Sequence, residues 1–92
     1  MTTHAPKNVP SLADVERRVS AIWMELLGVA EVNQSDNFLL LGGESLMAGQ
    51  AAARLQDAYG LEISLRTILV GTVAEVASEI VSELTAAGGS KC

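Results

Sequence analysis

The chain has 92 residues, of which 49% are hydrophobic and 18% charged, and its formal net charge is −5 at pH 7. This length and composition predict one small folded domain with little interior for a deep active site. The acidic balance disfavours binding to nucleic acid, and apolar runs such as Phe38 to Leu41 are far too short to span a membrane. The N-terminus has no apolar stretch typical of a secretory signal. We therefore expect a soluble, monomeric, cytoplasmic domain.

The first predicted element is a helix over about residues 12–27. Residues 1–10 precede it, contain both prolines, have no hydrophobic periodicity and are expected to form a flexible tail. Ser11 is a suitable N-cap, and Gly28 a suitable C-terminal cap. The apolar residues that recur at helical spacing are Leu12, Val15, Val19, Ile22 and Leu26. This spacing is typical of an amphipathic helix.

Residues 28–44 form a long connection without helical periodicity. Turn-forming residues and the pair Gly42-Gly43 disfavour regular structure here. Phe38, Leu39 and Leu41 are nevertheless large and apolar. We therefore expect this connection to pack across the core instead of extending into solvent.

Three further helices follow the connection. The second is predicted over residues 45–59, and a short apolar segment over residues 65–69 predicts one or two helical turns. The last helix begins at Thr72, with Glu75 three residues later in a capping-box pattern.

Together these elements predict an all-α four-helix bundle over residues 11–85. It has three longer helices, one short helix and a long loop between the first two. Residues 86–92 are expected to form a flexible C-terminal tail.

The single histidine and the single cysteine, His4 and Cys92, lie close to the chain ends. One cysteine can form neither an internal disulfide nor a thiolate metal site. A Ser-His-acid triad, a Cys-His pair or a histidine metal cluster would need one of these residues to fold back from a terminus. These enzyme classes and metal sites are therefore disfavoured, and Cys92 is interpreted as incidental.

Ser45 opens the second predicted helix, and Gly42 and Gly43 lie just before it, separated from it by Glu44. On propensity alone, such a serine is an N-cap. A side chain at this place also lies beside unpaired backbone N–H groups and the positive end of the helix dipole. A phosphodiester on its oxygen would be stabilised there, and the two glycines would leave the approach open to a modifying enzyme. The residues alone leave both interpretations open.

Two other functions of this segment are disfavoured. The hydrolase motif G-x-S-x-G lacks its last glycine because Met47 stands there, and both the preceding strand and a partner base are missing. A phosphate-binding loop would need a G-K-[ST] ending, and no lysine lies near the double glycine.

Other residues have a structural interpretation beside a functional one. The carboxylates of the central segment are Asp36, Glu44, Asp57 and Glu62. Each is most simply a solvated charge, but together they would form an acidic rim for basic partners. Trp23 is interpreted as a partly buried helix residue, and Met47 belongs either to the core or to an exposed contact patch.

Over residues 12–84 the chain resembles the peptidyl carrier proteins of nonribosomal peptide synthesis. The segment from Asp36 to Leu46 is similar to the family pattern D-x-F-F-x-L-G-G-[HD]-S-[LI]. The segment from Ile22 to Gly28 matches I-W-x-x-[LV]-L-G. Further on, Tyr59 to Arg66 resembles F-G-[VI]-x-[LI]-P-L-R, and Thr72 to Ala74 matches T-[VI]-A. Four matches in the family's order are specific, whereas G-G-x-S alone would not be.

The resemblance implies that Ser45 carries a covalent 4′-phosphopantetheine derived from coenzyme A. A phosphopantetheinyl transferase would attach it and would supply both the base and Mg²⁺. The thiol of the arm then holds an aminoacyl or peptidyl group as a thioester. A carrier of this kind is not an enzyme and needs no catalytic base of its own.

The resemblance also implies several partner enzymes. Besides the transferase, these are an adenylation enzyme and condensation, tailoring or thioesterase enzymes. Phe38 and Leu41 are expected to anchor the loop that positions the modified serine. The residues expected to contact the partners are Glu44, Leu46, Met47 and Gln50.

The chain departs from the family pattern at several positions. Glu44 stands where His or Asp is usual, Leu39 replaces the second Phe, and Ser64 replaces Pro. Gly71 also stands where Pro is usual, and the segment before Thr72 is one residue short. These departures favour a divergent, freestanding carrier over a module of a long synthetase, and a domain excised from a longer protein would look the same. The alternatives are an acyl carrier protein of polyketide or fatty-acid type and a non-carrier helical interaction module in which the serine is only a cap.

Overall fold

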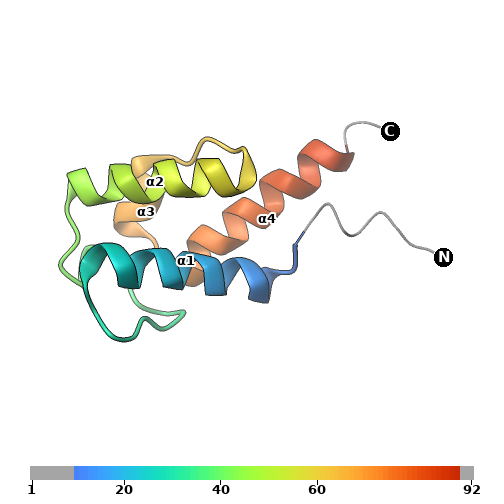
Figure 1. Ribbon diagram of the computed structural model, residues 1–92. Helices are drawn as coiled ribbons and strands as arrows, with labels where there is room; N and C mark the ends of the chain where they lie inside the picture. The colour runs from blue at the N-terminus through green and yellow to red at the C-terminus, as the bar shows by residue number, and fades with distance from the viewer. Residues whose placement is uncertain (1–9, 90–92) are drawn as a thin grey trace.

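The computed structural model describes residues 10–89. Its elements are α1 (Leu12–Leu27), α2 (Ser45–Tyr59), α3 (Leu65–Val70) and α4 (Val73–Gly89). Figure 1 shows α1 and α2 side by side and running in opposite directions, while α1 also packs against α4. The short α3 contacts both α2 and α4. Within the described range, the predicted all-α four-helix bundle with one short helix and a long first connection is confirmed.

The predicted helix caps are present at both ends of α1 and at the start of α4. Ser11 Oγ accepts a hydrogen bond from the Asp14 N–H at 3.1 Å, and Gly28 adopts a left-handed conformation with φ 69°. Thr72 Oγ1 accepts from the Glu75 N–H at 3.1 Å, and Glu75 Oε1 accepts from the Thr72 N–H at 2.9 Å. This reciprocal pair is the capping box expected from the sequence.

The core is apolar and draws residues from every helix and from the α1–α2 connection. Its largest fully buried side chains are Trp23, Phe38, Leu55, Ile68, Ile80, Val15, Val19, Val73 and Val76. Trp23 and Phe38 meet edge to face, with ring centroids 5.0 Å apart. The prediction that Trp23 is only partly buried is therefore wrong, because the Phe38 ring from the connection helps to enclose it.

The α1–α2 connection is fastened to the start of α4. Val73 N–H donates to Asp36 O at 3.2 Å, and Ala74 N–H donates to Gln34 O at 3.0 Å. Gln34 Nε2 also donates to Glu16 Oε1 on α1 at 2.8 Å. The connection thus lies across the bundle, as predicted.

Its apolar residues do not all point inward. Phe38 is fully buried and Leu41 packs partly buried against the core, so both anchor the loop as expected. Leu39 is 52% exposed and Leu40 is 86% exposed. Only the first and last of these four residues therefore hold the connection to the core.

The chain ends differ in part from the sequence-based boundaries. Helix α4 continues to Gly89, past the predicted domain end at residue 85, since Ala86 and Ala87 favour helix. Residues 1–9 and 90–92, including His4 and Cys92, lie outside the described residues. Between residues 10 and 89 no helix is both long and apolar enough to cross a membrane.

Candidate functional site

Ser45 is the first residue of α2, and Glu44 occupies the N-cap position. Glu44 has an extended backbone, with φ −140° and ψ 174°, and its carbonyl accepts the Ala48 N–H at 2.9 Å. The interpretation of Ser45 as an N-cap is therefore wrong: its backbone is already helical, so Glu44 takes that position. The Ser45 side chain is exposed to solvent.

The start of α2 has no side-chain cap. Ser45, Leu46 and Met47 precede the first intrahelical bond, and none of their N–H groups has a backbone or side-chain acceptor within residues 10–89. Unpaired N–H groups at a helix start favour a negatively charged group nearby, as does the positive end of the helix dipole.

The other three helices of the described chain begin differently. Ser11 caps α1, and Ser64 Oγ accepts from N–H groups in the first turn of α3. At α4 the Val73 and Ala74 N–H groups donate to carbonyls of the connection. The next N–H group, that of Glu75, donates to Thr72 Oγ1. Among these four helices, α2 thus has the least satisfied N-terminus, and this is where Ser45 lies.

Glycine is required at positions 42 and 43 for two different physical reasons. Gly42 has φ 101°, a conformation that other residues rarely adopt. Gly43 is buried, and a Cβ on it would overlap the Phe38 ring and lie 2.8 Å from the Phe38 carbonyl oxygen. The expectation that both glycines keep the approach to Ser45 open is therefore wrong for Gly43, which instead allows close packing on Phe38.

The predicted partner-contact residues lie around the start of α2. Glu44 and Gln50 are exposed, and Leu46 is 73% exposed. Leu46 and Gln50 are four residues apart and share one face of the helix. Met47 is partly buried against the core, so of the two interpretations of this residue the structure supports mainly the core contact.

Sequence reasoning did not identify Leu40 as an exposed residue near this site. The Leu41 and Gly43 N–H groups both bond to Phe38 O, at 3.2 and 3.0 Å, and this turn leaves Leu39 and Leu40 in solvent. The turn-forming residues before this turn predict its presence, but they do not show which of its side chains are exposed to solvent.

The four carboxylates of the predicted acidic rim come from three different segments of the chain. Glu44 lies at the start of α2 and Asp57 near its end, and a 15-residue helix is about 22 Å long. Glu62 comes after α2, and Asp36 accepts the Asn33 N–H at 2.9 Å within the connection. Of these four carboxylates only Glu44 is next to Ser45 in the sequence, and the acidic rim stays a prediction.

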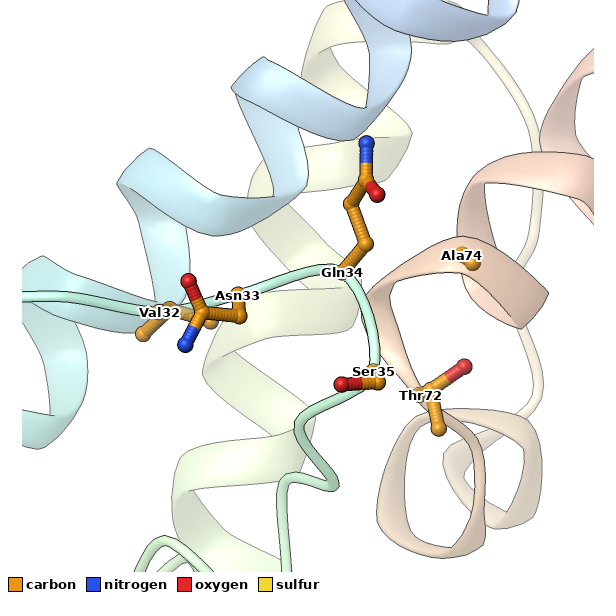
Figure 2. Close-up of a pocket in the computed structure, with 6 residues that line it drawn as sticks. All are labelled: Val32, Asn33, Gln34, Ser35, Thr72 and Ala74. Atoms are coloured by element: carbon orange, nitrogen blue, oxygen red, sulfur yellow. The ribbon is translucent and has the colours of Figure 1, made fainter.

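A surface cleft that Ser45 does not line lies between the α1–α2 connection and the start of α4. Its lining residues are Val32, Asn33, Gln34, Ser35, Thr72 and Ala74. Figure 2 shows Gln34 extending from the connection toward α1, where it bonds to Glu16. Among the described residues, no group of three His, Cys, Asp or Glu side chains is placed to hold a metal ion.

Residues 17–80 match a family model described as a phosphopantetheine attachment site. The chain belongs to this family. It is 40% identical over 83 residues to phosphinothricin tripeptide synthetase PhsC of Streptomyces viridochromogenes. That match covers 84% of this chain and 8% of the relative, so the chain spans only a small part of that protein.

Solved structures of carrier proteins share the fold. BlmI, a type-II acyl carrier protein from Streptomyces verticillus involved in bleomycin biosynthesis, has a TM-score of 0.75 and 33% identity, covering 80% of this chain and 90% of that chain. The complex of the phosphopantetheine transferase Sfp with coenzyme A and a peptidyl carrier protein contains a match with a TM-score of 0.70 and 28% identity. It covers 88% of this chain and 95% of that chain.

These similarities confirm the predicted carrier family and its covalent phosphopantetheine cofactor. The start of α2 fits such a group, because it combines an exposed hydroxyl with N–H groups that no side chain caps. A phosphodiester is an anion, and anions are stabilised at such a helix end.

Proposed function

We propose that Ser45 is the residue that carries 4′-phosphopantetheine, and that this domain holds an aminoacyl or peptidyl group as a thioester for nonribosomal peptide biosynthesis. The observation that carries the proposal is the exposed Ser45 hydroxyl at the uncapped start of α2, two residues after Gly43. The segment lies within the residues that match the family model.

The chemistry required of this chain is limited. Ser45 Oγ forms a bond to a phosphorus of coenzyme A and loses its proton, while the bond from that phosphorus to the adenosine bisphosphate breaks. The base and Mg²⁺ come from the transferase. The N–H groups at the start of α2 then face the new phosphodiester charge and stabilise it. Once attached, the arm supplies the thiol that holds the acyl group.

The partners we propose are a phosphopantetheinyl transferase, an adenylation enzyme and condensation, tailoring or thioesterase enzymes. These partners contact the exposed surface beside Ser45. That surface is formed by Glu44, Leu46 and Gln50, with Met47 at its edge. We further propose that the domain is not itself an enzyme and acts as a monomer in the cytoplasm.

Intact-mass measurement tests the proposal. The chain is incubated with a broad-specificity phosphopantetheinyl transferase, coenzyme A and Mg²⁺, and wild type is expected to gain the mass of one phosphopantetheinyl group. Ser45→Ala is expected to gain nothing. Ser64→Ala is the matched control, because Ser64 is an exposed serine at the start of another helix and is expected to leave the gain intact. An unmodified wild type, or a modified Ser45→Ala, contradicts the proposal.

A further inference from the structure

The side chain of Asn37 uses both its amide nitrogen and its oxygen. Its Nδ2 donates to Val70 O at 2.7 Å and to Gly71 O at 3.3 Å. Its Oδ1 accepts the Leu40 N–H at 3.2 Å. One side chain therefore joins the end of α3 to the turn that leads into α2.

The α3 side of this link is a very short connection. Only Gly71 and Thr72 separate α3 from α4, and Asn37 pairs with Thr72 in an isolated β-bridge. Carbonyls at a helix end lack intrahelical partners, and Asn37 supplies a donor to two of them. Gly71 is buried, and its N–H donates to Thr67 O at 3.0 Å, a bond that proline at this position could not make.

The other side of the link leads to Ser45 through successive contacts. The Leu41 N–H bonds to Asn37 O at 3.1 Å, and the turn that follows places the Phe38 ring against Gly43. Gly43 directly precedes the N-cap residue of α2. The position of the Ser45 hydroxyl therefore depends on a turn whose first residue also holds the α3–α4 connection.

We propose that Asn37 is a positioning residue for modification at Ser45, coupling the α3–α4 connection to the turn before α2. This proposal rests on the proposed function of Ser45. Asn37 touches no reacting atom and acts by fixing where Ser45 Oγ is presented to the transferase. A small displacement of a reacting group lowers the rate of its reaction steeply. Loss of the Asn37 side chain is therefore expected to lower kcat for modification of Ser45 more than it raises KM.

Two substitutions separate the halves of the link. Asn37→Asp retains an acceptor for the Leu40 N–H but loses the donor to Val70 O and Gly71 O. Asn37→Ala loses both. We expect both variants to lower kcat/KM for transfer from coenzyme A by about tenfold or more. Ser11→Ala is the matched control, because it removes an N-cap hydrogen bond from α1 and leaves the turn before Ser45 untouched.

The rates are measured by intact mass at a temperature where circular dichroism shows every variant folded. Asn37→Ser, in which the hydroxyl still favours a turn but reaches fewer partners, replaces any variant that does not fold and is also expected to be slow. If Asn37→Asp is modified at the wild-type rate, the inference is overturned, even when Asn37→Ala is slow. A slow Ser11→Ala also overturns it, because stability alone would then explain the loss. Failure of wild type to be modified contradicts instead the proposed function of Ser45.

Discussion

The Phe38 ring occupies the space that a Cβ on Gly43 would need. The same ring packs edge to face on the buried Trp23, so it cannot move aside without disturbing the core. Because Gly43 lies two residues before Ser45, this contact fixes where α2 begins.

Gly43→Ala is expected to destabilise the fold by about 1–3 kcal/mol, as overpacking at a buried position does. The free energy of unfolding is measured by urea denaturation. We expect slower modification at Ser45 as well, because the start of α2 must shift.

Gly49→Ala is the matched control for that substitution. Gly49 lies inside α2, and a Cβ there would meet only the Leu65 side chain at 4.0 Å, an ordinary contact. Alanine is expected to stabilise this helix by about 0.5–1 kcal/mol. Equal destabilisation by the two substitutions would contradict the role assigned to the Phe38 contact.

Ser45→Ala is expected to change the free energy of unfolding by less than about 0.5 kcal/mol, because Ser45 is exposed and is not the N-cap. Thr72→Ala removes a cap and is expected to cost about 1 kcal/mol. Urea denaturation of both variants distinguishes a modification site from a structural cap. If Ser45→Ala lowers the free energy of unfolding as much as Thr72→Ala does, the result would support the alternative in which the domain is a helical interaction module.

Leu46→Asp is expected to slow modification several-fold without lowering stability, because this side chain is 73% exposed beside Ser45. Leu12→Asp is the control, since Leu12 is 45% exposed at the start of α1. The transferase rate and the melting temperature are compared for both. Unchanged modification of Leu46→Asp would remove Leu46 from the proposed contact surface.

Partial burial raises the pKa of Tyr59 above its ordinary value of 10.0, although the nearby Arg18 opposes this shift. The folded state then binds the phenolic proton more tightly than the unfolded state does. The contribution of Tyr59 to the free energy of unfolding is fully present below pH 10 and is lost as the pH rises above that value. Urea denaturation between neutral and alkaline pH is expected to show a steeper loss for wild type than for Tyr59→Phe. Parallel curves would contradict this assignment.

Sequence patterns were sufficient where the determinants are local. The limits of α1 follow from Ser11, Gly28 and the spacing of apolar residues between them. The capping box of Thr72 and Glu75 was likewise visible, because both partners lie within one helical turn.

Features that depend on distant contacts could not be predicted in the same way. The full burial of Trp23 requires Phe38, and the need for glycine at Gly43 arises from the same ring. Asn37 bonds to residues more than thirty positions away, at Val70 and Gly71. Periodicity and propensity carry no information about such pairings.

The most direct test of the central claim is to locate the phosphopantetheine on the wild-type chain. After reaction with the transferase and coenzyme A, tryptic cleavage at Arg18 and Arg54 releases one peptide that contains Ser20, Ser35 and Ser45. Fragmentation of this peptide is expected to place the added phosphopantetheine mass on Ser45. Finding it on Ser20 or Ser35, or on any other peptide, would contradict the account.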